Sequence, residues 1–391
     1  MKALRLNSLL ILIIIANILN MLYPKGMGYE VQTGIEYQLS KYAYGLCILI
    51  MLPSLLSTKK FYFNKMRYMS FMIIIYILFG YGFHMSFEMG DYLKTLMICL
   101  SFLFFEDIFE KRAYNKQLIY VYVLSIFVNI TYLTLTQNRL ETAVENEGHI
   151  GGGQGIATSM VFLVPFMFYL FKGKLSAFLY LLGMVAIIVS LRRTAILAYL
   201  FCLPFVYSRI KSSMSKTTLF FIVLGLALIG YVVVNDYWFV MEDRFADTFE
   251  ENKSGYYGSG RTGWWQVLVD NFFDSPGNWL QGFGVGRVAQ DMANAGFPFE
   301  SAHNDYLEIG YTYGFIGLFL WFGTIIDILR LSWKTTFKGN RPLISMCSLS
   351  YLLVAFVSGV TRNPHFMCVA MFGAMMLSTI GRGRLLKTIR K

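Results

Sequence analysis

Charged residues are scarce in this sequence. Only 15% of its 391 residues are charged, whereas soluble globular chains contain about a quarter. Hydrophobic residues make up 56%, and they are grouped in blocks of about 17 to 25 residues, long enough to cross the hydrocarbon core of a bilayer. The composition therefore excludes a soluble cytosolic or secreted protein and indicates a membrane protein.

Cysteine and several common catalytic motifs are scarce or missing as well. The sequence contains no GxxxxGKS/T, HExxH or GxSxG segment, which argues against a nucleotide-driven machine, a zinc protease and an α/β-hydrolase. The five cysteines show no CxxC or CxxH spacing and all fall in apolar blocks, where a thiol serves as a small apolar side chain. They are Cys47, Cys99, Cys202, Cys347 and Cys368.

The apolar blocks predict about twelve transmembrane helices in an all-α fold. We expect the first block to be a retained span rather than a signal peptide, because no small-residue cleavage site follows it and Asn17 and Asn20 interrupt it. The predicted spans are residues 6–23, 41–57, 68–86, 91–109, 117–136, 155–171, 174–190, 191–208, 216–235, 305–329, 342–360 and 363–380.

Basic residues are distributed unevenly over the predicted loops. With the N-terminus inside, the cytoplasmic segments hold 23 of the 34 Lys and Arg residues and only four of the 23 acidic residues, so the inside carries +19 and the outside −8. Lys and Arg accumulate in short cytoplasmic loops. Both termini are therefore predicted to be cytoplasmic, and the net charge of +11 reflects membrane orientation rather than binding of nucleic acid.

The apolar stretch 175–207 is interrupted only by Arg192 and Arg193. It is long for one helix and short for two. A single helix would reverse the orientation of every later segment and place the acidic residues of 236–304 inside, against the charge distribution. We therefore predict two short spans that meet at this arginine pair on the outer face.

One outer loop, residues 236–304, is much longer than the others and is predicted to form a small folded cap within a single integral-membrane domain of residues 1–391. The segment from Arg261 to Phe273 has the apolar spacing of an amphipathic helix that lies on the membrane or on a lid. Pro276 and Gly277 should follow its end.

Arg193, Arg261 and His303 all fall on the predicted outer rim. An arginine is costly near hydrocarbon unless it meets an anion, and its planar fork matches the oxygens of a phosphate. These residues are a candidate site for a phosphorylated lipid whose head group faces outward. The alternative is that interfacial arginines reach lipid head groups and loop arginines pair with the acidic outer loops.

Five short segments carry a family resemblance. They are VSLRRTA at 189–195, GSGRTGWW at 258–265, GFGVG at 282–286, AHNDYLE at 302–308 and YGFIG at 313–317. Each is weak alone, but their order and spacing within a polytopic protein resemble the O-antigen polymerase and ligase family.

This resemblance implies a GT-C-like, multi-pass glycosyltransferase of the bacterial plasma membrane, with an extracytoplasmic site. It implies transfer of a glycan from undecaprenyl diphosphate to an acceptor hydroxyl without metal or cofactor. In the family, arginines matching Arg193 and Arg261 hold the diphosphate, and a histidine matching His303 assists proton removal. The other candidate substrate contacts are Arg192, Arg362, Asn304, Asp305 and Glu308, of which either carboxylate is also a candidate to orient or replace the histidine.

Three activities remain open at this point. A polymerase, which we favour, would join lipid-linked repeat units, with a chain-length regulator and a flippase as further candidate partners. A ligase would transfer the glycan to lipid A core or another envelope acceptor. A flippase or transporter is disfavoured, because such proteins bury charged residues at mid-span, whereas the charges here gather at the outer rim.

Overall fold

The structure is a computed structural model, and it describes residues 2–22, 35–56, 89–110, 115–136, 153–171, 174–189, 193–210, 231, 261–297, 301–333, 341–357 and 366–376. Every regular element in these residues is a helix, which agrees with the predicted all-α class. The elements are α1 (Lys2–Leu22), α2 (Ile35–Leu56), α4 (Met89–Glu110), α5 (Lys116–Thr136), α7 (Gly153–Leu170), α8 (Lys174–Val189), α9 (Arg193–Ile210), α11 (Arg261–Phe273), the 3-10 turn η1 (Pro276–Asn278), α12 (Arg287–Asn294), α13 (Asp305–Trp333) and α14 (Arg341–Val357). Residues 366–376 form a further short helical segment.

Helices occur at ten of the twelve predicted spans, while the blocks 68–86 and 216–235 lie outside the described residues except for Tyr231. Within the described part of the chain, one helix, Asp305–Ile326, is long and apolar enough to cross a membrane. Several others are apolar but shorter. The number of twelve spans therefore stays a prediction.

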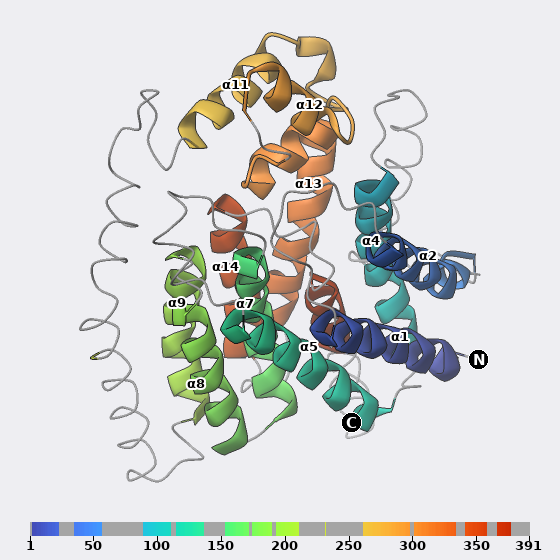
Figure 1. The fold of residues 1–391 in the computed structure, drawn as a ribbon, viewed down its shortest axis with the longest axis vertical. Coiled ribbons are helices and arrows are strands. Elements are labelled where there is room, and N and C mark those ends of the chain that lie inside the picture. Colours follow the sequence, from blue (N-terminus) through green and yellow to red (C-terminus); the bar gives the residue numbers. More distant parts are fainter. Residues whose placement is uncertain are drawn as a thin grey trace, which may run out of the picture.

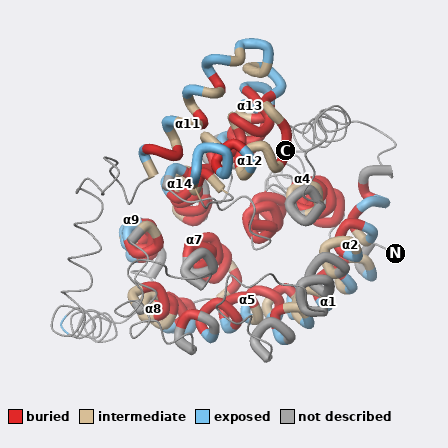
Figure 2. Tube along the Cα trace, turned by 45° about the horizontal axis from the view of Figure 1, so that its top comes forward, coloured by how far each residue is buried: buried red, intermediate tan, exposed pale blue. Residues whose placement is uncertain are grey.

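The exposed face of helix α5 is largely apolar. After the exposed Lys116 and Gln117 at the start of α5, the exposed residues recur every three or four positions and are Val121, Leu124, Val128 and Tyr132. Figure 2 shows how buried and exposed positions alternate around this helix. A helix of a soluble protein would carry polar residues on that face. Apolar residues on both faces are typical of a helix with protein on one side and lipid on the other, and that α5 crosses a membrane stays a prediction.

The helices form a bundle with a cap at one end (Figure 1). Helix α1 packs on α5, α2 packs on α4, and α7 lies between α5 and α14. Helix α14 also packs on α9 and α13. In Figure 1, α11 and α12 lie at the top of the molecule beside the start of α13.

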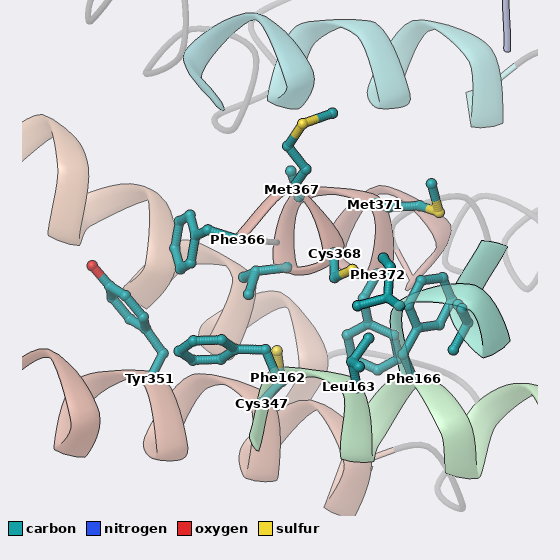
Figure 3. Packing of buried hydrophobic residues seen from close by; sticks show 14 of the residues in the cluster. Phe162, Leu163, Phe166, Cys347, Tyr351, Phe366, Met367, Cys368, Met371 and Phe372 are labelled. Atoms are coloured by element: carbon teal, nitrogen blue, oxygen red, sulfur yellow. The ribbon is translucent and has the colours of Figure 1, made fainter. Parts of the chain in front are cut away.

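The interior of the bundle is filled by aromatic rings. Figure 3 shows Phe162 of α7, Tyr351 of α14 and Phe366 gathered in this core. The Phe162 and Phe366 rings meet edge-on at 5.8 Å, and the Tyr351 and Phe366 centroids are 4.9 Å apart. The Trp321 indole of α13 donates to the Tyr351 hydroxyl at 2.8 Å, which ties α13 to the core. All five cysteines are free and buried, as predicted.

Two buried asparagines connect helices α1 and α5 inside the bundle. Asn17 of α1 donates to the Ser125 hydroxyl of α5 at 3.2 Å and accepts from the Asn129 amide at 3.3 Å. Such side chains stabilise helix pairs in lipid, where an unpaired polar group is costly. The asparagine that interrupts the first apolar block therefore holds α1 against α5.

The predicted break at the arginine pair is confirmed: α8 ends at Val189 and α9 begins at Arg193. The two helices are locked by a tyrosine pair, since Tyr180 donates to the Tyr199 carbonyl at 2.7 Å and Tyr199 donates to the Tyr180 carbonyl at 2.9 Å. Their rings stack at 4.4 Å. That the break lies on the outer face stays a prediction.

The amphipathic helix in the long loop is confirmed as α11, and η1 follows it at Pro276. Its apolar face does not lie open. Trp264, Leu268 and Phe272 are buried in a second hydrophobic cluster, separate from the bundle core, that joins the cap to α13. The other buried members are Val288, Met292, Ala302 and Tyr311.

Helix α13 is broken at Gly314, which has φ 65° and ψ −169°. The loop after η1 supplies the hydrogen bonds that this break removes. Phe283 and Gly284 donate from their backbone to the carbonyls of Tyr311 and Thr312 at 2.8 and 3.0 Å. In return, the carbonyls of Trp279 and Leu280 accept from the N–H groups of Phe315 and Ile316 at 2.8 and 3.3 Å. Backbone groups on both sides of the kink are thus satisfied.

This exchange requires the two backbones to touch at Gly282 and Gly314. Gly282 has φ 76°, and a Cβ atom placed there would lie 2.5 Å from the Gly314 nitrogen and from the Thr312 carbonyl. No side chain fits at that distance. Two of the family-like segments, GFGVG and YGFIG, are therefore partners in one structural joint.

We predict that Gly282→Ala lowers stability by about 2 kcal/mol or more, because it adds both backbone strain and a backbone clash. Gly277→Ala is the matched control, since a Cβ at Gly277 would meet nothing within 4 Å. The measurement is the fraction of detergent-solubilised protein that stays monodisperse after heating. Equal melting of the two variants would contradict the joint.

Candidate functional site

The site is built around a short turn, residues 301–304, that leads from the cap into α13. Asn304 ends the turn as the N-cap of α13: its side-chain oxygen accepts from the backbone N–H groups of Tyr306 and Leu307 at 3.0 and 3.2 Å. Such a cap satisfies donors that a helix start leaves unpaired. Asn304 is buried and starts the helix, and that it also contacts a substrate stays a prediction.

His303 has an unusual backbone. Its φ of 50° makes it the one non-glycine residue with positive φ in the described part of the chain. Its N–H donates to the Ser301 hydroxyl at 3.2 Å. Strained residues of this kind persist only where their surroundings hold them, and they concentrate at functional sites. The backbone thus singles out the residue that the sequence assigned as the base.

Glu308, one turn into α13, reaches back to the same turn. One oxygen of its carboxylate, Oε2, accepts from the Ser301 hydroxyl at 3.0 Å and from the Ala302 N–H at 2.9 Å. The side chain is 5% exposed. Asp305, the first residue of α13, is fully buried, and its negative charge lies at a helix N-terminus, where the helix dipole favours it.

Helix α11, which begins at Arg261, packs against this turn through two tryptophans. The Trp265 indole donates to the Ala302 carbonyl at 2.8 Å, and the Trp264 ring lies 6.0 Å from the His303 ring. Arg261 precedes these tryptophans by three and four positions, so all three share one face of α11. Arg261 therefore lies one helical turn before two tryptophans that contact the His303 turn, and that Arg261 and His303 form one site stays a prediction.

Burial lowers the pKa of the Arg261 guanidinium, because a partly desolvated cation is less stable than a hydrated one. An arginine nevertheless stays charged at neutral pH. Its charge is held in a site that is less polar than water, where an interaction with a phosphate is stronger than at an open surface.

The other predicted arginines are less well described. Arg193 is the first residue of α9, but its side chain lies outside the described part of the chain, as do Arg192 and Arg362 entirely. The aromatic contact between Trp265 and Phe356, at 6.0 Å, shows that the end of α14 also reaches the cap. Whether these arginines join Arg261 stays a prediction.

A second polar cluster in the cap was not predicted from the sequence. Asp291 of α12 accepts from the Tyr311 hydroxyl and pairs with Arg287 at 3.0 Å, while the Tyr311 ring stacks on Phe283 at 4.4 Å. The spacing of Arg287 and Asp291, four residues apart on a helix, was the available signal. This cluster fastens α12 to α13 rather than adding groups to the histidine turn.

The groups that could take part in chemistry here are the Arg261 guanidinium and the His303 imidazole. Trp264 and Trp265 supply the apolar surface of α11 that contacts the His303 turn. Within the described residues, no three His, Cys, Asp or Glu side chains lie close enough to hold a metal ion together. Metal independence stays a prediction.

Comparison with known proteins gives one family match. Residues 177–322 match the family model described as O-antigen ligase, a segment that contains Arg193, Arg261, His303 and Glu308. No curated protein matches the chain. The match covers a little over a third of the sequence, from α8 into α13, including the cap and every segment that carried the resemblance. Over these residues the chain is similar to the O-antigen ligase family, which agrees with the resemblance carried by the five short segments.

Proposed function

We propose that the protein is a polysaccharide polymerase that transfers a glycan from undecaprenyl diphosphate to a hydroxyl of a second lipid-linked repeat unit. The observation that supports this proposal is the contact of Trp264 and Trp265, which follow Arg261 on α11, with the turn that contains His303. The family match supports the broader assignment to glycan assembly in the bacterial inner membrane.

Arg261 suits the leaving group of this reaction. When the bond between the sugar and the diphosphate breaks, negative charge grows on the phosphate oxygen. A cation already held in place stabilises that charge more in the transition state than in the bound donor. We assign Arg261 to this work, with Arg193 or its neighbour Arg192, and also Arg362, as further phosphate contacts.

His303 suits the acceptor. A sugar hydroxyl is a weak nucleophile, and a general base whose pKa lies near neutrality removes its proton as the new bond forms. We assign His303 as that base, and the hydroxyl oxygen then attacks the anomeric carbon as the diphosphate leaves. The proton passes to the imidazole.

The charge distribution supports an extracytoplasmic site. The cap segment 236–304 belongs to the side with the net charge of −8, and both termini belong to the side with +19. We propose that the lipid donor enters from the outer leaflet. A chain-length regulator and a flippase are proposed as partners.

Ligation is the second candidate, because the matching family model is described as an O-antigen ligase. In a ligase the same donor chemistry would end on lipid A core or another envelope glycan. The two activities differ in the acceptor, so an experiment with defined acceptors separates them.

The first test supplies purified protein in vesicles with one defined undecaprenyl-diphosphate repeat unit and a chelator. A polymerase makes a ladder of longer lipid-linked chains, and it does so without divalent cations if arginines carry the diphosphate charge. Mass spectrometry of the lipid fraction is the measurement.

Other results identify other activities. A ligase consumes the donor only after a second glycolipid is added. A flippase moves the lipid across the bilayer and leaves its mass unchanged. An unchanged donor mass with every acceptor supplied would overturn the enzyme proposal, and loss of the ladder in chelator would overturn its metal independence.

The second test is Arg261→Lys. We expect a loss of about 10²-fold in transfer rate, by analogy with the removal of one donor from an oxyanion site, because a point charge does not reproduce the paired donors of a guanidinium. Arg287→Lys is the matched control: this arginine lies in the same cap, its side chain is 42% exposed, and a lysine can still pair with Asp291.

The control should keep the wild-type rate. Comparable rates for the two lysine variants, at equal expression, would remove Arg261 from the proposed diphosphate site.

The third test is His303→Ala, which should lower the rate of transfer by about 10²-fold or more while donor binding is kept, since the proposed work of His303 is on the acceptor. Donor binding is measured with a fluorescent lipid diphosphate. His149→Ala, in the predicted loop between α5 and α7, is the control. An active His303→Ala protein would require another base.

A further inference from the structure

We infer that Glu308 is a positioning residue for His303: its buried carboxylate clamps the 301–303 turn and so sets the direction of the imidazole. The inference rests on the proposed function and deepens it. It gives Glu308 a task other than contacting the sugar or replacing the histidine as base.

The position of Glu308 on α13 determines which groups its carboxylate contacts. Side chains on a helix lean toward its N-terminus, and Glu308 lies one turn after the N-cap Asn304, with its own N–H donating to the Asn304 carbonyl at 2.9 Å. Its carboxylate therefore meets the residues that precede the helix. It accepts there from the Ser301 hydroxyl and the Ala302 N–H.

Ser301 connects the Glu308 carboxylate to the His303 backbone through two hydrogen bonds. Its hydroxyl donates to Glu308 at 3.0 Å and accepts from the His303 N–H at 3.2 Å. The carboxylate thus holds, through one hydroxyl, the backbone of the residue with positive φ. Loss of the Glu308 acceptor would remove the hydrogen bond that orients the Ser301 hydroxyl.

Both neighbours of His303 are fixed as well. Ala302 is fully buried, its N–H donates to Glu308 and its carbonyl accepts from Trp265. Asn304 is the N-cap of α13. His303 therefore lies between two residues whose positions are fixed by hydrogen bonds. These contacts restrain the backbone conformation of His303.

The burial of Glu308 favours this role over direct contact with a substrate. The side chain is 5% exposed, whereas His303 is partly exposed. Two donors from the turn converge on the same carboxylate oxygen. A general base must reach the proton that it takes, and the partly exposed imidazole meets that condition.

The experiment compares Glu308→Gln, Glu308→Ala and Ser301→Ala in the transfer assay. Glutamine keeps an oxygen acceptor for both donors but has no negative charge, and it should lose no more than about fivefold in kcat. Alanine removes the clamp and should lose about 10²-fold, the effect expected when a catalytic group is displaced by about 1 Å. KM for the donor should change little in either.

Ser301→Ala should fall between these two variants. Because Ser301 and Glu308 act through one network, the double variant should be no slower than Glu308→Ala alone. Asp270→Asn is the matched acid-to-amide control, since Asp270 is exposed on α11, and it should keep the wild-type rate.

A second measurement does not depend on activity. The rate at which diethyl pyrocarbonate modifies His303, followed by mass spectrometry of its peptide with the other histidines as references, should change in Glu308→Ala and stay at the wild-type value in Glu308→Gln. If Glu308→Ala does not fold, the glutamine and serine variants carry the test.

Two results would overturn the clamp. One is a Glu308→Gln protein as inactive as Glu308→Ala, which would make the charge itself essential. The other is a Glu308→Ala protein with wild-type kcat and wild-type labelling of His303. If the wild-type protein makes no ladder of lipid-linked chains, polymerisation is contradicted but the clamp is not. The labelling experiment still reports whether Glu308 sets the position of the imidazole.

Discussion

The backbone exchange between the loop at Trp279–Gly284 and the broken helix α13 is the constraint on which the rest of the site depends. A helix near or within lipid must satisfy every N–H and C=O group, and the break at Gly314 would leave several without partners. The loop supplies them from a segment far away in the sequence. Because the same loop connects α11 to α12, the break fixes the cap on α13, and this holds α11, which begins at Arg261, against the turn that contains His303.

The family-like segments therefore divide into two kinds. The glycines of GFGVG and YGFIG serve architecture, since only glycine permits the close contact of Gly282 with Gly314. GSGRTGWW and AHNDYLE combine both kinds of residue: Trp265 and Asn304 hold the turn, while Arg261 and His303 supply the proposed chemistry. In these two segments, the residues proposed for chemistry are thus accompanied by residues that hold the turn in place.

Features that depend on local pattern were predictable from the sequence, and those that depend on distant contacts were not. Helix α11 was predicted with its observed bounds, Arg261–Phe273, because its apolar spacing and the following proline are local signals. The break between α8 and α9 followed from charge. The kink at Gly314 was missed, since 305–329 is one apolar block and the groups that stabilise the kink lie in another part of the chain. The hydrogen bonds of Glu308 were missed for the same reason, although the residue itself was identified.

The joint at Gly314 also determines how the protein can move. Four backbone hydrogen bonds connect the cap loop to α13 in place of the helix's own, so the cap cannot tilt away unless the helix loses its continuity. We therefore expect the cap and α13 to move together as one rigid unit. If the lipid-linked donor proposed above reaches the His303 turn, a movement of the helices that pack beside α13 would admit it without breaking these four hydrogen bonds.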